Sequence, residues 1–288
     1  MPARLLDGRA MAADLRTELT HVAAARAAEL GHPAGLAIVR VGADPASAVY
    51  TRRLSRTAEE VGVAAQTVAL PITCTEARLR ETLGQLNANP TVQGILMQLP
   101  LPPRLSQRAV AESIDPRKDV DGISLGSSGS LFLRLPTFVP STCAAVLELL
   151  DRGGIALAGR HVVIVGASNV VGKPLAFMLL RRDATVTVCH IATRNLAAWT
   201  RQAEVLIVAA GRSALVTGEM VRPGATVIDV GINVGEHGEI VGDVEQSSVT
   251  PVAGVLSPVP GGVGPLTSLM LLKQCVNGPQ LLEGESPA

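Results

Sequence analysis

The sequence predicts an α/β protein made of two α/β domains, each with a largely parallel sheet. Short apolar runs alternate with helix-patterned stretches over residues 10–99, and the same alternation starts again at residue 159. At 288 residues and 47% hydrophobic content, the chain is long enough for two modest cores. We therefore place one domain at residues 1–139 plus 268–288 and the other at residues 140–267.

Charge and hydropathy exclude several classes of protein. Lys and Arg number 25, as do Asp and Glu, so no net field draws the chain to nucleic acid or to a membrane surface. No apolar run approaches the roughly 18 residues of a membrane span. The first seven residues are too polar for a signal peptide. We expect a cytoplasmic protein that binds neither nucleic acid nor membrane.

The cysteines and histidines give no sign of a disulfide framework or a metal site. The four cysteines are widely spaced and form no CxxC pair, and the five histidines form no ligand cluster. We expect no metal, and we expect buried free thiols in a reducing compartment. The cysteines are Cys74, Cys143, Cys189 and Cys275.

Capping signals set the expected limits of the elements in the first domain. Asp44 followed by Pro45 is typical of a helix start. The spacing from Thr73 to Glu76 resembles a capping box that opens another helix. The expected helices cover 10–30, 44–61 and 73–87, and the expected strands cover 36–41, 65–70 and 94–99.

The middle of the chain is expected to join the two domains. Residues 115–122 should form a loop, followed by an irregular Gly/Ser stretch at 126–129. Ser141 should cap a helix, and the last helix, residues 265–276, is apolar enough to pack on the first domain. In the second domain we expect strands at 161–165, 185–189, 205–209 and 225–230 and a helix at 173–182.

A glycine turn at residues 166–172 links an expected strand to an expected helix. Such a turn presents backbone N–H groups and a helix N-terminus to a pyrophosphate. The pattern is not GxGxxG, and a P-loop would need glycine at Ala167 and Ser or Thr at Pro174. A plain strand-to-helix turn is the alternative, but we favour a Rossmann-type dinucleotide-binding turn.

The end of the second strand in a dinucleotide-binding domain usually selects the ribose. Here Cys189, His190 and Ile191 occupy that place, and they offer neither a carboxylate for a ribose diol nor an arginine for a phosphate. Arg194 follows closely and could bind a phosphate. A solvated arginine at a helix start is the simpler interpretation of Arg194.

Several polar residues occupy places where ligands bind, although each has a structural explanation. Tyr50 lies on the helix that starts near Asp44, and taken alone it fits a core aromatic with its hydroxyl at the rim. Gln98 ends an apolar strand, where open α/β sheets bind ligands. Asp119 and Asp121 lie in a loop, so one could cap the backbone while the other binds a ligand.

Residues 257–267 hold three prolines and three glycines, with Val and Leu between them. Proline fixes φ and removes a donor, whereas glycine lets a backbone approach another group closely. The segment is either a rigid turn before a helix or a stiff loop that presents main-chain groups to a ligand.

Six stretches in this order resemble the bifunctional methylenetetrahydrofolate dehydrogenase/cyclohydrolase family over nearly the whole chain. The resemblance implies two α/β domains with a cleft between them, the second of Rossmann type, and a homodimer. It also implies a tetrahydrofolate derivative as substrate and NADP or NAD as cofactor. The stretches are residues 44–50, 94–100, 118–122, 166–174, 224–233 and 257–267.

The resemblance also implies a role for individual residues. The expected catalytic residues are Tyr50, which would stack near the folate, and Gln98 and Asp121, which would hold the pterin. The expected substrate-binding residues are Tyr50, Leu54, Gln98, Leu99, Asp121, Pro258, Pro260, Gly261, Gly262, Val263 and Leu266. The expected cofactor-binding residues are Gly166, Ala167, Ser168, Ile191, Arg194 and Ile232.

One departure from the family concerns the hydrolytic step. The family has a lysine four residues after its tyrosine, where this chain has Leu54. A desolvated lysine can lose its proton and activate water, which leucine cannot do. We therefore expect cyclohydrolase activity to be weak or lost. The dehydrogenase step depends mainly on orientation and on the cofactor, so it should suffer less.

Two further departures concern the ligands. Family members commonly have Arg at Ala167 and Ser at Ile191, near the NADP phosphate, and both polar groups are missing here. Because an arginine–phosphate contact is strong, we favour NAD, with Arg194 as the residue that could restore NADP binding. Residues 123–126 also depart from the family, which alters the expected substrate pocket.

These departures leave two rival functions. The chain could be a family member that kept its pterin-binding residues but acts on a different small molecule. It could also be a non-catalytic protein that binds a folate or a nucleotide. Retention of Tyr50, Gln98, Asp121 and residues 257–267 argues against the second rival.

Overall fold

The computed structural model describes residues 2–235 and 237–280. The described chain divides into two compact units. The six-stranded unit holds residues 2–13 and 142–267, and the three-stranded unit holds residues 14–141 and 268–280. The six-stranded sheet and the three-stranded sheet are both parallel, which confirms the predicted α/β class.

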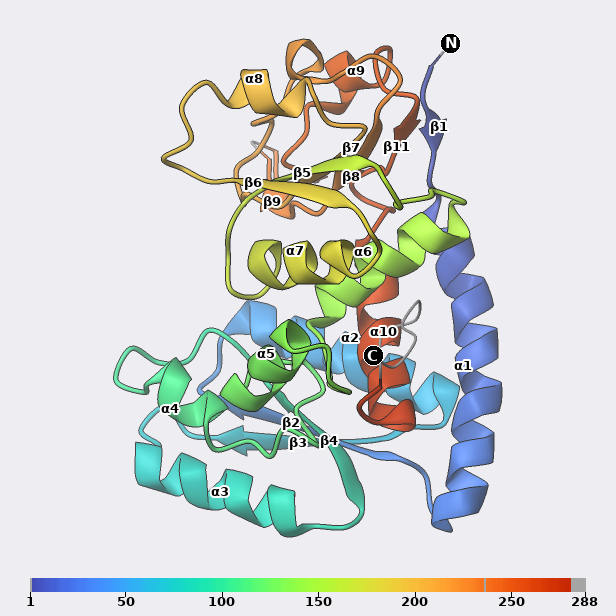
Figure 1. Ribbon diagram of the computed structural model, residues 1–288. Helices are drawn as coiled ribbons and strands as arrows, with labels where there is room; N and C mark the ends of the chain where they lie inside the picture. The colour runs from blue at the N-terminus through green and yellow to red at the C-terminus, as the bar shows by residue number, and fades with distance from the viewer. Residues whose placement is uncertain (1, 236, 281–288) are drawn as a thin grey trace. The chain divides into compact units, whose positions relative to one another are not determined.

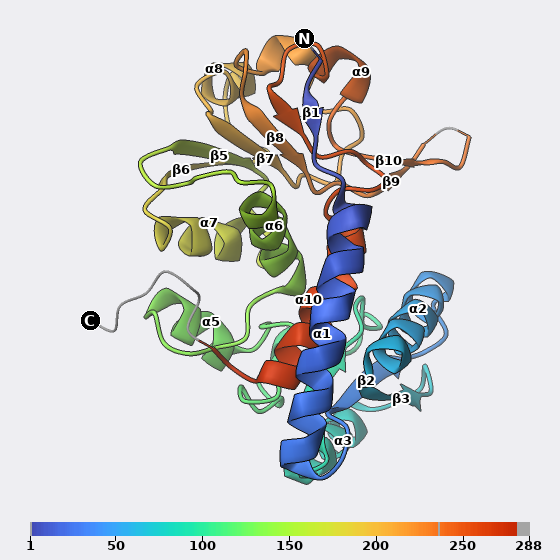
Figure 2. The same cartoon turned by 90° about the vertical axis from the view of Figure 1, so that its right-hand side faces the viewer.

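The three-stranded unit is built around β2 (Gly35–Val41), which lies between β3 (Ala64–Leu70) and β4 (Val92–Met97). Helix α3 (Glu76–Ala88) covers one face of the sheet, and α2 (Pro45–Val61) lies over the other (Figures 1 and 2). Six of the seven residues of β2 are buried, as in parallel sheets covered on both faces. The unit also contains α4, α5 and most of α1 and α10, which span Gln107–Ala111, Leu125–Phe132, Gly8–Leu30 and Gly264–Asn277.

Local capping chemistry fixes the ends of α2 as the sequence predicts. The Asp44 carboxylate accepts a hydrogen bond from the Ser47 N–H at 2.7 Å, and Pro45 occupies the first helical position. Gly62 ends the helix in the left-handed region, with φ of 82°. Helix α3 differs from the prediction, because its cap is Thr75 rather than a box formed by residues 73–76.

The six-stranded unit has the strand order β1-β11-β8-β7-β5-β6. Helices α6 and α7 lie on one face of the sheet, and α8 and α9 lie on the other (Figures 1 and 2). The strands are β1 Arg4–Leu5, β5 His161–Val165, β6 Thr185–Cys189, β7 Val205–Val208, β8 Thr226–Asp229 and β11 Val255–Leu256. The helices are α6 Ser141–Arg152, α7 Gly172–Leu180, α8 Leu196–Thr200, α9 Gln246–Val249 and the 3-10 helix η1 Gly218–Met220. A separate antiparallel hairpin joins β9 (Asn233–Val234) to β10 (Ile240–Val241).

Two segments differ from the sequence-based expectation. Residues 126–129 belong to α5 instead of an irregular stretch, because the Ser124 hydroxyl caps the Ser127 N–H and Gly126 packs tightly on Pro116. The start of the chain lies with the six-stranded unit, because β1 pairs with β11 in parallel register. The proposed limits of a folate-binding domain at 1–139 plus 268–288 stay a prediction.

The cores are formed by the apolar faces of the two sheets and their helices. All four cysteines are buried and free, which confirms the predicted thiol state. Within residues 2–235 and 237–280, no helix combines the length and the apolar character that crossing a membrane requires.

Candidate functional site

Tyr50 lies on α2 in the three-stranded unit, where its side chain is partly buried. Burial raises the pKa of Tyr50 to about 12, the negative charge of Asp121 adds to the rise, and a hydrogen bond with Ser268 opposes it. The phenol therefore stays protonated at neutral pH. It is a hydrogen-bond donor beside a carboxylate.

Asp121 lies in the loop after the buried Val120. Its Oδ1 accepts hydrogen bonds from the Ser141 N–H at 3.1 Å and from the Ser141 hydroxyl at 2.7 Å. Burial raises the pKa of Asp121, the bonds from Ser141 lower it, and the Asp119 charge raises it again. Ser141 thus holds one carboxyl oxygen of Asp121, and Asp121 is the ligand-binding candidate of this loop.

Asp119 has a structural part in the same loop. It is fully buried and accepts bonds from the Ile123 N–H at 3.2 Å, the Ser124 N–H at 2.7 Å and the Ser127 hydroxyl at 2.7 Å. These bonds hold the start of α5. Of the two loop carboxylates, Asp119 supports the backbone, and Asp121 stays the ligand-binding candidate.

Leu54 follows Tyr50 by one helical turn and has no exposed surface. Burying a leucine contributes about 1.5–3 kcal/mol to stability. Leu54 cannot take or give a proton, so this position of α2 supplies packing and no acid–base chemistry. The neighbouring Arg52 and Arg53 are exposed.

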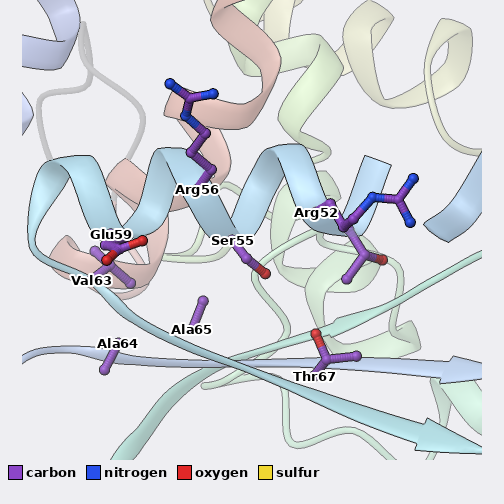
Figure 3. A pocket seen from close by; sticks show the side chains of 9 residues that line it. Arg52, Ser55, Arg56, Glu59, Val63, Ala64, Ala65 and Thr67 are labelled. Atoms are coloured by element: carbon purple, nitrogen blue, oxygen red, sulfur yellow. The ribbon is translucent and has the colours of Figure 1, made fainter. Parts of the chain in front are cut away.

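A separate groove of about 550 Å³ lies between α2 and β3, and it does not contain the candidate residues. Figure 3 shows Ser55 and Thr67 on opposite sides of this groove, while Arg56 points away from the strands. Neither Tyr50 nor Leu54 lines it. The groove therefore does not belong to the candidate folate site.

Gln98 and Leu99 follow β4 at the carboxyl end of the strand. The Gln98 N–H donates to the Val39 carbonyl at 2.8 Å, which extends the pairing with β2. Among the hydrogen bonds of the described residues, none involves the Gln98 side-chain amide, although this side chain is almost buried. An amide held there offers both a donor and an acceptor to a ligand.

The proline- and glycine-rich loop of residues 257–267 lies in the six-stranded unit, and it is distant in sequence from Tyr50, Gln98 and Asp121. The Gln246 side chain donates to the Val259 carbonyl at 2.6 Å, and Gly261 adopts a φ of 117°. A Cβ at Gly262 would lie 2.7 Å from the Pro258 carbonyl oxygen. The loop is a fixed backbone, and its other expected site residues are Pro260, Val263 and Leu266, the last two buried.

The glycine turn joins β5 to α7. Gly166 has a φ of 123°, and a Cβ there would lie 2.1 Å from the Ala209 carbonyl oxygen. A Cβ at Gly172 would lie 1.9 Å from the Gly166 carbonyl oxygen. Only glycine fits either position, and no side chain caps the start of α7. Because Ser168 is exposed and Ala167 is partly exposed, the turn is open to a pyrophosphate.

The remaining cofactor candidates follow the strands at the same carboxyl edge of the sheet. Ile191 follows β6 and is fully exposed, and Ile232 follows β8 and is 71% exposed. Arg194 is exposed, and within the described part of the chain no ion pair includes it. Open parallel sheets bind nucleotides at this edge.

Sequence reasoning missed four residues that hold these groups. Ser141 was expected only as a helix cap, and Ser268 was not singled out. Asp229 and Asp243 are buried beside the loops at the carboxyl edge of the six-stranded sheet. Asp229 is a polar residue at the end of an apolar strand, and Gln98 directly follows another such strand. A polar residue at the end of an apolar strand is the signal that could have identified Asp229.

Comparison with known proteins gives matches over almost the entire chain. Residues 6–121 match the family described as "Tetrahydrofolate dehydrogenase/cyclohydrolase, catalytic domain", and residues 140–281 match its "NAD(P)-binding domain". "Bifunctional protein FolD" of Acidiphilium cryptum is 50% identical over 273 residues, which cover 95% of this chain and 96% of that protein.

Solved structures agree with these sequence matches. The bifunctional enzyme FolD of Campylobacter jejuni is 42% identical with a TM-score of 0.93, covering 95% of this chain and 97% of that one. The Trypanosoma brucei methylenetetrahydrofolate dehydrogenase-cyclohydrolase, complexed with NADP and inhibitor, is 36% identical with a TM-score of 0.90. That match covers 96% of this chain and 97% of the trypanosome chain.

Proposed function

This chain belongs to the tetrahydrofolate dehydrogenase/cyclohydrolase family and is a methylenetetrahydrofolate dehydrogenase with a nicotinamide cofactor, and from that premise we propose how its residues work. Tyr50, Gln98 and Asp121 bind and orient the folate substrate. Residues 166–168, 191–194 and 232 bind the cofactor. Cyclohydrolase activity is weaker than in relatives that carry a lysine at the position of Leu54.

The neighbouring Tyr50 and Asp121 are the observation that carries the substrate assignment. A protonated phenol donates a hydrogen bond, and a carboxyl group held by Ser141 accepts one from a pterin N–H. The Gln98 amide adds one donor and one acceptor. Three such groups on rigid elements fix the orientation of a flat heterocycle, which is what hydride transfer requires.

The glycine turn supports the assignment of the cofactor. When bound there, a nicotinamide cofactor would supply the hydride acceptor for oxidation of the methylene carbon of the substrate. Gly166 and Gly172 let the backbone of the turn pack closely, and although the Val171 and Lys173 N–H groups donate to Ser168, the start of α7 supports binding of a pyrophosphate. The exposed Ile191 and Ile232 offer apolar surface to the rest of the cofactor.

The proposal that cyclohydrolase activity is weak rests on Leu54. Hydrolysis of methenyltetrahydrofolate needs a group that takes a proton from water, and this position of α2 supplies none. Full bifunctionality is the second candidate, because a protein 50% identical to this one carries the name bifunctional. In that case another residue would have to take over the proton transfer.

The preference for NAD rests on Ala167 and Ile191. Neither side chain can pair with a 2′-phosphate, whereas the exposed Arg194 could. The trypanosome relative binds NADP, which supports the alternative. We also propose a cytoplasmic homodimer, and light scattering of the purified protein would report its mass.

A spectrophotometric assay tests the proposed function. The purified protein is given methylenetetrahydrofolate with NAD or with NADP, and reduced nicotinamide is followed. Reduction with at least one cofactor supports the dehydrogenase assignment. The Asp121→Asn variant should lose most of the activity while keeping its fold. An unchanged rate would show that Asp121 does not bind the substrate.

A further inference from the structure

Two buried aspartates lie at the carboxyl edge of the six-stranded sheet. Asp229 ends β8 and is 1% exposed, and Asp243 follows β10 with no exposed surface. Neither belongs to the residues proposed to touch the substrate or cofactor. Each buried carboxylate must be satisfied by donors, and the donors identify the segments that the pair holds.

Asp243 holds the loop that follows β7. Its Oδ2 accepts hydrogen bonds from the Ala210 N–H at 2.6 Å and the Gly211 N–H at 2.8 Å. Its Oδ1 accepts from the Arg212 N–H at 2.9 Å. Three successive backbone donors therefore point at one carboxylate, which sets the course of residues 210–212.

The two aspartates also hold both sides of Ile232. Asp229 Oδ1 accepts from the Gly231 N–H at 2.9 Å. The Asn233 side-chain amide donates to Asp243 Oδ1 at 2.9 Å. The residue between these two anchors is the exposed Ile232, so its position depends on both carboxylates.

Asp229 and Asp243 form one network. Asp229 Oδ1 accepts from the Asp243 N–H at 3.0 Å, and Asp229 Oδ2 accepts from the Val244 N–H at 3.0 Å. A Cβ at Gly231 would lie 2.4 Å from the Asp243 carboxyl group. A Cβ at Gly242 would lie 1.8 Å from Asp229 Oδ2. The backbone closes around the carboxylates with no room for a side chain.

We propose that Asp229 and Asp243 are positioning residues for the nicotinamide cofactor, which hold the loops after β7 and β8 in the conformation that binds it. The proposal rests on the proposed function, because it takes residue 232 and the carboxyl edge of this sheet as the cofactor site. Neither aspartate touches the cofactor. Their effect passes through residues 210–212 and 231–233.

The ionisation of Asp229 gives this network a pH dependence. Burial raises the pKa of Asp229 to about 6, three backbone hydrogen bonds oppose the rise, and the charge of Asp243 adds to it. Asp243 is the charged side chain that faces Asp229. The Ser257 hydroxyl donates toward the backbone carbonyl of Asp229. Protonation places an O–H where a backbone donor now points. Cofactor affinity should therefore fall as the pH drops through about 6.

Isothermal titration calorimetry with NAD and with NADP tests the proposal. For wild-type protein, the Kd of the cofactor should rise up to about fourfold from pH 7.5 to 5.5, the limit for one carboxyl group whose pKa is about 6. In Asp229→Asn, the Kd at pH 7.5 should be about tenfold higher than that of the wild type, and it should change little with pH. Asp151→Asn is the matched control, because Asp151 lies in the same unit in an ion pair with Arg182.

Asn233→Ala is a second, milder variant, which keeps the proposal testable if Asp229→Asn does not fold. It removes one bond to Asp243 and leaves both carboxylates in place. We expect weaker cofactor binding with an unchanged pH midpoint and an unchanged melting temperature. If both Asn233→Ala and Asp229→Asn bind as wild type does, or if the wild-type Kd is flat from pH 7.5 to 5.5, the positioning role is wrong.

The failures of the two proposals are distinguishable. Wild-type protein that binds neither cofactor at either pH contradicts the proposed function itself. A purely structural role for Asp229 predicts that stability and affinity change together. The raised pKa instead makes the folded state more stable in acid, while affinity falls there, so the two measurements should move in opposite directions.

Discussion

Burial of the Tyr50 phenol, with the negative charge of Asp121 adding to the effect, raises the pKa of Tyr50 to about 12. The two side chains belong to the same unit, one from α2 and the other from the loop after Val120. A partly buried donor and a partly buried acceptor therefore lie close enough to interact electrostatically. The phenol and the carboxyl group give this part of the three-stranded unit polar groups that suit a polar heterocycle.

Replacing Tyr50 by phenylalanine should weaken folate binding and leave the fold intact. The change removes one hydroxyl, so we expect a five- to tenfold rise in KM for methylenetetrahydrofolate, corresponding to about 1 kcal/mol. Steady-state kinetics at pH 7.5 measures it. Ser268→Ala is the control, because it removes the partner of the hydroxyl but keeps the phenol. An unchanged KM in Tyr50→Phe would place the substrate elsewhere.

Replacing Leu54 by lysine should increase cyclohydrolase activity. The amine would stand one helical turn from Tyr50 in a desolvated position, where its pKa falls toward neutrality and it can act as a base. Hydrolysis of methenyltetrahydrofolate, followed by its absorbance, measures the gain. Leu54→Met keeps the volume without a base and should show no gain. Equal rates in the two variants would show that the hydrolytic pocket has changed beyond this residue.

Replacing Ala167 by arginine should shift the cofactor preference toward NADP. A guanidinium in the turn after β5 could pair with the 2′-phosphate of a cofactor bound at the proposed site. We expect the ratio of kcat/KM for NADP over NAD to rise about tenfold or more. Ala167→Gln supplies a long uncharged side chain as control. If the ratio does not change, Arg194→Ala should reveal whether that arginine already recognises the phosphate.

The raised pKa of Asp229 makes a prediction about stability as well as binding. Its pKa rises from 3.8 to about 6, so the folded state binds the proton more tightly than the unfolded state. The stabilisation is present in full below pH 3.8 and is lost as the pH rises through about 6. The shift corresponds to about 3 kcal/mol. Urea unfolding of wild type and Asp229→Asn, compared at pH 5 and 7.5, should show about 1.4 kcal/mol of this difference in the free energy of unfolding, because at pH 5 the group is already ionised in the unfolded state.

Local signals in the sequence were sufficient for most of the fold. Asp44 and Pro45 start α2, and Gly62 ends it, because caps and turns depend on neighbouring residues alone. The strands follow from apolar runs in the same way. The start of the chain was assigned differently, because the pairing of β1 with β11 joins segments about 250 residues apart.

The candidate site could be predicted only in part. Tyr50, Gln98 and Asp121 stay predictions, which rest on strand ends and on the family resemblance. The network of Asp229 and Asp243 was missed, because its donors come from three loops that the sequence does not bring together. The Gly/Ser stretch at 126–129 was expected to be irregular, since glycine disfavours helices, but the Ser124 cap and the contact with Pro116 outweigh that preference.

The most direct test of the central claim is a single reaction followed to its end. Methylenetetrahydrofolate is oxidised by the wild-type protein with its preferred cofactor, and the methenyl product is followed in the same cuvette. We predict that methenyltetrahydrofolate accumulates and then decays little faster than in buffer. Decay that keeps pace with its formation would show a bifunctional enzyme and contradict the role assigned to Leu54. Absence of reduced nicotinamide would contradict the dehydrogenase assignment itself.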